Sequence, residues 1–401
     1  MKGFIKLYLD SYRGLSNATW MLTIIMLINR SGAMVIPFLG VYMMQVLNFS
    51  ITDTGTVLSC FGFGAVAGSI LGGWLTDKAG HFKVQLITLF LSVPVFFILP
   101  VLKTPLSLSI GVFILSLITE TFRPANSVSI ASYARPENLT KAFSLNRMAM
   151  NLGFSIGPAL GGFLASISYN WLFYGNSISV ALAGLIFLFY FWSRTNNTSS
   201  GNQTDESVAD TSPVISPWKD YTFLIFSLLC SIYCICFFQF LSTLPLFYRE
   251  VHHLNEWNIG LILAFSGLVV FSLEMLLIHI AQRKMSPAHA IILGTLLCGL
   301  AFMLLIFKGG YFLLYSGMFI LCISEILAIP FMASVSLKRA SKQKQGAYMG
   351  INALCFSIAH ILSPFLGTRV VNSFGYSTLW LAIGVVTIIT SIGFWQIMKK
   401  M

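Results

Sequence analysis

The sequence predicts an all-α integral membrane protein with twelve transmembrane helices in two pseudo-symmetric six-helix bundles. Of its 401 residues, 56% are hydrophobic and only 9% are charged, whereas soluble domains contain about 25% charged residues. Apolar windows of the roughly 20 residues that cross a bilayer recur along the whole chain. One long polar stretch lies near the middle. The ~10-residue alternating segments of a membrane β-barrel are not visible.

The apolar windows place the spans in chain order. They are expected at 16–45, 54–76, 84–102, 105–128, 142–166, 171–193, 218–246, 257–281, 287–307, 310–334, 346–368 and 374–397. The polar stretch between the sixth and seventh spans is rich in Ser, Thr and Asn and cannot bury a core. We therefore predict an N-terminal bundle over 1–193, a cytoplasmic linker over 194–217 and a C-terminal bundle over 218–401.

The placement of basic residues predicts the orientation. Of the 24 Lys and Arg, 17 fall on one set of loops and tails and four fall on the opposite loops. Cytoplasmic loops carry such an excess, so we expect both termini in the cytoplasm and a location in the bacterial inner membrane. The net charge of +11 therefore indicates the lipid bilayer as the partner, not nucleic acid. The seven cysteines lie in apolar segments and are interpreted as packing residues, with no metal site.

The two halves of the chain resemble each other. Glu120 and Glu325 are 205 residues apart, and Pro158 and Pro364 are 206 apart, each followed by glycine three positions later. A constant offset indicates an internal repeat. Transporters built from repeats bind substrate between them near the middle of the membrane.

The stretch GGWLTDKAGHFK, 72–83, closes the second span. It resembles the signature of the major facilitator superfamily at Gly73, Leu75, Asp77, Lys78, Gly80 and Lys83, and departs from it at His81 and Phe82. We expect Gly73 to allow close helix packing and Asp77 to pair with a helix terminus. The resemblance implies that Gly73, Asp77, Lys78, Gly80 and Lys83 form a conformational latch on the cytoplasmic side.

A second motif, NLGFSIGPALGG, lies at 151–162 in the fifth span. Gly153, Gly157, Pro158, Gly161 and Gly162 resemble the end of the superfamily's antiporter motif, although Ser144 stands where an earlier glycine is expected. Small residues at this spacing make a flat face for close packing, and Pro158 removes a backbone donor. Two interpretations remain open, a general packing face and the hinge and seal of an exporter.

Six charged residues lie well inside the predicted spans, away from their first few residues: Arg30, Glu120, Arg123, Arg147, Glu274 and Glu325. Exposed to lipid at the midplane, they would together cost roughly 15–20 kcal/mol on insertion scales. They must therefore pair with one another or face a water-filled cavity. The superfamily resemblance implies that spans one, four, seven and ten line such a cavity, which favours Arg30, Arg123 and Glu325.

These residues supply the candidate site. The proton-coupling candidates are Glu325, Glu274 and Glu120, because a carboxyl in apolar surroundings binds a proton more readily. The substrate-binding candidates are Arg30, Arg123, Arg147, Asn29, Asn151, Gln239 and His360. Glu120 and Arg123 share a helix face, and a purely structural pair is the alternative. Gln239 and His360 also fit a packing role.

We expect a proton-coupled secondary transporter that moves a small organic solute by alternating access, and we favour a drug/proton antiporter working in efflux. It would act as a monomer and use the proton gradient in place of a cofactor, and it would not be an enzyme. The alternative is proton-driven uptake of a small charged solute such as a di- or tripeptide. Arg30 and the stretch 324–340 resemble proton-dependent oligopeptide transporters, but Met26 and Asn29 stand where that family has acidic residues. A receptor or scaffold is a third class.

Overall fold

The chain is predominantly helical in the part described by the computed structural model, which covers residues 15–135, 138–192, 217–307, 309–340 and 345–400. No strand occurs among these residues. Twelve helical segments there are long and apolar enough to cross a bilayer, which confirms the predicted class. The α-helices are α2 (Asn17–Ser31), α3 (Val35–Gln45), α4 (Ile51–Ala79), α5 (His81–Ile98), α6 (Pro105–Tyr133), α7 (Leu139–Ile167), α8 (Asn170–Phe191), α9 (Tyr221–Phe237), α10 (Gln239–Ser242), α11 (Leu244–Glu250), α12 (Glu256–Lys284), α13 (Pro287–Leu304), α14 (Tyr311–Arg339), α15 (Gln345–Phe374) and α16 (Tyr376–Met398).

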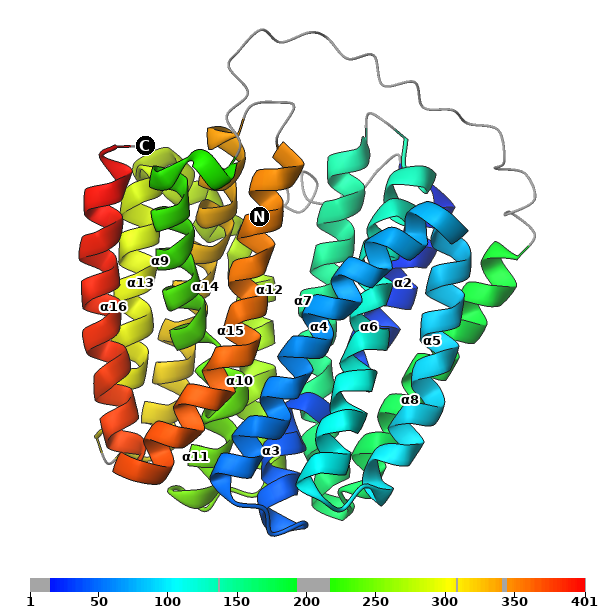
Figure 1. The fold of residues 1–401 in the computed structure, drawn as a ribbon, viewed down its shortest axis with the longest axis horizontal. Coiled ribbons are helices and arrows are strands. Elements are labelled where there is room, and N and C mark those ends of the chain that lie inside the picture. Colours follow the sequence, from blue (N-terminus) through cyan, green and yellow to red (C-terminus); the bar gives the residue numbers. More distant parts are fainter. Residues whose placement is uncertain (1–14, 136–137, 193–216, 308, 341–344, 401) are drawn as a thin grey trace, which may run out of the picture. The chain divides into compact units, whose positions relative to one another are not determined.

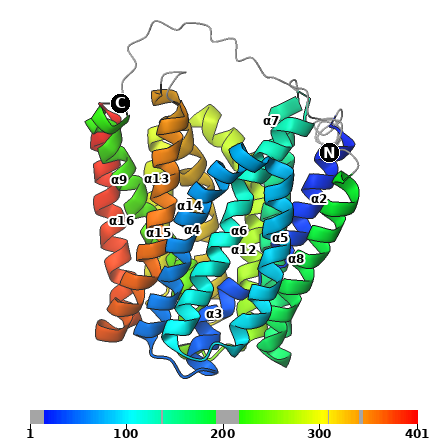
Figure 2. The same cartoon turned by 45° about the vertical axis from the view of Figure 1, so that its right-hand side comes forward.

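The helices group into two compact units. Of the described residues, unit 1 holds those within Met1–Phe38, Gly64–Asn202 and Asn255–Gly267, and unit 2 holds those within Leu39–Phe63, Gln203–Leu254 and Leu268–Met401. In unit 1, α5 packs against α6 and α8 (Figure 2). In unit 2, α13 packs against α14 and α16, and α9 packs against α15 and α16 (Figure 1). Nearly all of the expected linker lies outside the described residues, so the domain boundaries stay a prediction.

Each unit includes a segment from the other half of the chain. Residues 39–63 belong to unit 2, where a Cβ added at Gly55 would lie 2.8 Å from the Pro364 carbonyl oxygen and one added at Gly62 would lie 2.6 Å from the Ile361 nitrogen. The first half of α4 therefore packs closely on α15. By the order of the helices, this is the end at which α3 leads into α4 and α11 into α12. We call it the α3–α4 end.

The first span is broken, whereas its hydropathy predicts one continuous helix. α2 ends at Ser31 and α3 begins at Val35, because Pro37 has no N–H to donate to the carbonyl of Ala33. Side chains of α8 bind the exposed backbone, with Ser179 Oγ donating to the Ile28 carbonyl at 2.6 Å and Asn176 Oδ1 accepting from the Met34 N–H at 3.2 Å. The break is thus fixed in place by a neighbouring helix.

The seventh span is broken in a corresponding place. α9 ends at Phe237, the short α10 covers Gln239–Ser242, and α11 begins at Leu244. Pro245 is the cause here, because it cannot donate to the carbonyl of Leu241. The first span of each half therefore has the same proline-dependent interruption.

Each half also caps its first helix with a residue that reaches the end of the fourth. In unit 1, Ser16 Oγ accepts the Thr19 N–H at 3.1 Å and donates to the Tyr133 carbonyl at 2.8 Å. In unit 2, Asp220 Oδ1 accepts the Phe223 N–H at 3.1 Å and Oδ2 lies 2.8 Å from Nε of Arg339. The unit 2 version is an ion pair, whereas the unit 1 version is neutral.

Asp220 is the centre of the unit 2 connection. The Tyr348 hydroxyl also donates to its Oδ2 at 3.1 Å, which joins α9, α14 and α15. Burial alone would raise the pKa of Asp220, but the hydrogen bonds from Arg339, from the Phe223 N–H and from Tyr348 hold that pKa below its usual value. The carboxylate is therefore stabilised in its charged form.

Candidate functional site

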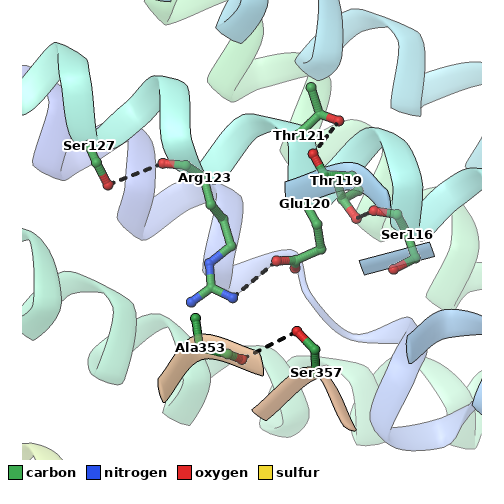
Figure 3. A network of polar contacts seen from close by, with 9 residues as sticks. Ser116, Thr119, Glu120, Thr121, Arg123, Ser127, Ala353 and Ser357 are labelled. Carbon is green, nitrogen blue, oxygen red and sulfur yellow. Dashed lines mark hydrogen bonds and ion pairs between the residues drawn. The ribbon is translucent and has the colours of Figure 1, made fainter. Parts of the chain in front are cut away.

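Glu120 and Arg123 form an ion pair on α6. Nη1 of Arg123 lies 3.0 Å from Oε2 of Glu120, and Figure 3 shows the two groups facing each other from one side of the helix. The Glu120 side chain is 11% exposed and that of Arg123 is 55% exposed. Pro124 follows directly inside the helix and leaves the Glu120 carbonyl without its helical donor. The buried carboxylate is thus held by a cation that extends outward.

Arg30 lies in the last turn of α2. Its Nε atom is buried and has no hydrogen-bond partner in the part of the chain that the structure describes. Its positive charge is attracted by Glu120 and repelled by Arg123, so the three residues lie within electrostatic range. We call Arg30, Glu120 and Arg123 the charge cluster. Within it, two cations share one anion.

The glycines of α7 bring α2 and α3 into close contact with that helix. A Cβ added at Gly153 would lie 2.6 Å from Cβ of Arg30, and one added at Gly157 would lie 3.1 Å from the Arg30 carbonyl oxygen. Gly161 lies against Met34, with 2.9 Å between the added Cβ and Cβ of Met34. The motif therefore packs directly on the break in the first span and sets the position of Arg30.

A second face of α7 packs on α12. A Cβ added at Gly162 would lie 2.5 Å from the Glu256 carbonyl oxygen, and one added at Gly260 would lie 2.5 Å from the Pro158 carbonyl oxygen. Ser155 Oγ donates to the Ala264 carbonyl at 2.8 Å. We call these contacts the α7–α12 seam. They join the fifth span of the first half to the eighth span, in the second half, within unit 1.

The expected latch residues lie where α4 leads into α5. Asp77 and Lys83 are exposed, and no hydrogen bond or ion pair joins the Asp77 side chain to another residue in the described ranges. The Lys78 ammonium lies 4.8 Å from the centroid of the Trp74 ring. Gly80 has φ +83°, a left-handed conformation that favours glycine. The turn therefore has a glycine in the left-handed region and a carboxylate open to solvent, and the latch role stays a prediction.

Gly73 does not have the expected role in helix packing. A Cβ added there would meet no atom within 4 Å, whereas one added at Gly72 would lie 2.6 Å from the Thr121 carbonyl oxygen. Gly72 continues a four-residue spacing from Gly64 and Gly68, both of which face α6. Adjacent residues on a helix point about 100° apart, so Gly73 leaves that face.

The sequence matches the model of the Major Facilitator Superfamily over residues 19–364. The chain belongs to the major facilitator superfamily. It is 26% identical to the MFS-type transporter YttB of Bacillus subtilis (strain 168) over 92% of each chain. It is 23% identical to the quinolone resistance protein NorA of Staphylococcus aureus (strain MSSA476), over 88% of this chain and 89% of that protein.

A solved structure has the same fold. The crystal structure of a peptide transporter POT in complex with sulfate aligns with a TM-score of 0.81 at 14% identity, covering 97% of this chain and 96% of that one. At this identity the likeness concerns the fold alone. As a superfamily member the chain is a membrane transporter, not an enzyme.

The other charged and polar candidates of this superfamily member are spread over several helices. Arg147 is exposed on α7, while Asn151 and Asn29 are half-buried. Glu274 is buried on α12. Glu325 is half-buried on α14, within electrostatic range of Tyr233 and Cys322. In the described part of the chain, no group of three His, Cys, Asp or Glu side chains is arranged to hold a metal ion.

Gln239 has a structural role in place of the expected substrate contact. Its side chain is buried, Nε2 donates to the Ser363 carbonyl at 2.8 Å, and Oε1 accepts from the Thr243 hydroxyl at 2.8 Å. The amide thus ties the break in the seventh span to α15. The His360 ring lies 4.2 Å from the ring of Phe238 and 6.4 Å from that of Phe61, centroid to centroid. These contacts favour the packing alternative for His360.

Two tyrosine–glutamate hydrogen bonds were not expected from the sequence. The Tyr169 hydroxyl donates to Oε1 of Glu256 at 2.6 Å, and the Tyr376 hydroxyl donates to Oε2 of Glu250 at 2.6 Å. The tyrosines are 207 residues apart, close to the repeat offset, and each lies before or at the start of its half's last span. The internal repeat could therefore have indicated that the two tyrosines occupy corresponding positions in the two halves. The two glutamates flank the connection between α11 and α12.

Proposed function

We propose that the protein is a proton-coupled secondary transporter that exports a small organic solute from the cell in exchange for protons. The observation that carries this proposal is the glycine face of α7. Gly153 and Gly157 pack on the broken first span, and Gly162 packs on α12. We assign this motif two tasks, which are to position Arg30 and to seal one end of the bundle. The relative NorA is a quinolone resistance protein, which supports export over uptake.

Transport by alternating access requires that the two ends of the helical bundle close in turn. We orient the α3–α4 end toward the outside, on the basis of the cytoplasmic excess of basic residues. The α7–α12 seam and the packing of α4 on α15 keep that end closed, and they must separate for solute to leave. Asp77, exposed at the opposite end, would pair when that end closes. The working unit is a monomer in the inner membrane.

The carboxyls of Glu120, Glu274 and Glu325 are the proposed proton carriers. A carboxyl exchanges its proton when its partners or its exposure to water change. Glu120 has such a partner in Arg123, and Glu325 lies within electrostatic range of Tyr233. Substrate binding near the charge cluster would alter the partners of Glu120 and so connect solute to proton.

Proteoliposomes that contain a pH-sensitive dye test this function. Internal alkalinisation on adding a lipophilic drug outside supports exchange of protons for solute. Internal acidification on adding di- or tripeptides replaces export with proton-driven uptake. Arg123→Ala and Glu325→Gln should abolish the drug-dependent signal at normal expression. Asp53→Asn, which neutralises a half-buried carboxylate in the first turn of α4 outside the charge cluster, should keep it. Full activity in both Arg123→Ala and Glu325→Gln would contradict a mechanism that depends on these charged residues.

A further inference from the structure

Arg30 combines a buried donor with an unbalanced charge. Its Nε atom is out of contact with solvent and has no hydrogen-bond partner among the described residues. An unsatisfied buried donor is costly, and more so when it carries charge. Each such group in a native structure requires an explanation, and an acceptor supplied from outside the chain is one. The donor therefore calls for an acceptor from outside the chain.

The carboxylates of unit 1 do not supply that acceptor. Its described part contains three, Asp77, Glu120 and Glu256. Asp77 is exposed at the turn between α4 and α5, and Glu256 accepts the Tyr169 hydroxyl at 2.6 Å. Glu120 is bound by Arg123 at 3.0 Å. The charge cluster is thus left with one positive charge in excess.

The backbone around Arg30 is held firmly. Gly153 leaves no room for a side chain beside Cβ of Arg30, and Gly157 lies against its carbonyl oxygen. The Ser179 hydroxyl binds the Ile28 carbonyl at 2.6 Å, half a turn earlier on α2. The backbone from which the guanidinium extends is therefore preorganised, which favours ligand recognition.

We propose that Arg30 binds the carboxylate of an amphipathic organic acid or zwitterion, and that this group defines the substrate class. The proposal rests on the proposed transport function and adds the chemistry that the site selects. A guanidinium presents parallel N–H donors that match the two oxygens of a carboxylate. Arg123 is the weaker candidate for this task, because Glu120 already occupies it. The span that carries Arg30 is apolar, which suits the rest of an amphipathic solute.

Binding of a matched fluorescent pair tests the assignment. Dansyl-phenylalanine carries a free carboxylate, and dansyl-phenylalanine amide differs only at that group. With purified protein in nanodiscs and no pH gradient, the acid should bind about tenfold or more tightly than the amide, as expected for hydrogen bonds to a charged group. Arg30→Gln should remove this preference by weakening the acid alone. Arg30→Lys keeps the positive charge but lacks the parallel N–H donors, so it should retain only part of the preference for the acid.

Controls separate this proposal from general damage and from failure of the transport function. Arg369→Gln removes an arginine stacked on the Phe365 ring and should leave the preference intact. Equal binding of acid and amide, no binding of the acid, or an unchanged preference in Arg30→Gln overturns the proposal. If Arg30→Gln fails to fold, the Arg30→Lys variant decides by the same comparison. Selective binding of the acid without any proton flux in proteoliposomes would contradict the transport function alone. Proton flux that is the same for acid and amide, and unchanged in Arg30→Gln, would contradict this inference alone.

Discussion

Gly162→Ala tests whether the α7–α12 seam closes the α3–α4 end. The added methyl group would lie 2.5 Å from the Glu256 carbonyl oxygen and 3.0 Å from Cα of Gly260. Both are backbone atoms, so neither helix can relieve the clash by rotating a side chain. Overpacking of this kind costs about 1–3 kcal/mol. Because the clash exists only while the seam is closed, that cost raises the open population by roughly 5- to 150-fold.

A cysteine at position 54 reports this population. Thr54 is fully buried in the first turn of α4, so a Thr54→Cys thiol reacts with a membrane-impermeant maleimide only when the α3–α4 end opens. The labelling rate should rise several-fold or more in the Gly162→Ala background, after subtraction of the parent chain's own cysteines. Gly350→Ala is the matched control, since a Cβ there meets no atom within 4 Å. Equal rates in the two backgrounds would refute the role of the seam.

Three further predictions follow from the contacts. Tyr169→Phe removes the hydrogen bond to Glu256, which joins the two halves of the sequence, and should raise the Thr54→Cys labelling rate. Tyr376→Phe removes a hydrogen bond within the second half and should leave that rate unchanged. A higher rate in Tyr376→Phe than in Tyr169→Phe would contradict the role of the Tyr169–Glu256 bond in closing the α3–α4 end. Asp220→Asn should lower the free energy of unfolding by about 1–3 kcal/mol at neutral pH. Because the pKa of Asp220 is lowered in the folded state, its contribution is present above the ordinary Asp pKa of about 3.9 and is lost as the pH falls through the folded value, so thermal unfolding of wild type and variant should converge in acid. Asp77→Asn should slow the transport cycle at unchanged substrate affinity, and a change in affinity alone would count against a latch.

The number and order of the spans follow from the sequence because crossing hydrocarbon requires long apolar helices. The interruptions at residues 32–34 and at Thr243 do not appear in a hydropathy window, which averages over them. Pro37 and Pro245 nevertheless mark them, since each removes a specific backbone donor. The two helix breaks could therefore be predicted from the sequence, provided that single prolines were considered separately from the window-averaged hydropathy.

Only part of the candidate site could be predicted from the sequence. The Glu120–Arg123 pair follows from a three-residue spacing on one helix. The hydrogen bonds of Gln239 could not be predicted, because its partner, the Ser363 carbonyl, is 124 residues away in the sequence. Gly73 and Gly72 differ by one position, and only the four-residue spacing from Gly64 separates the packed glycine from the open one. Contacts between distant helices determine which polar side chains are already occupied.

The exchange of segments between the units has a consequence for biogenesis. A ribosome delivers the first six spans to the membrane well before residues 255–267, yet those residues belong to unit 1. Until α12 arrives, Gly162 and the Pro158 carbonyl lack the helix on which they pack in the folded protein. The first half of the chain is therefore an unfinished folding unit. Its assembly is completed by the start of α12, so the seam that we propose to close one end of the transporter also completes unit 1 during synthesis.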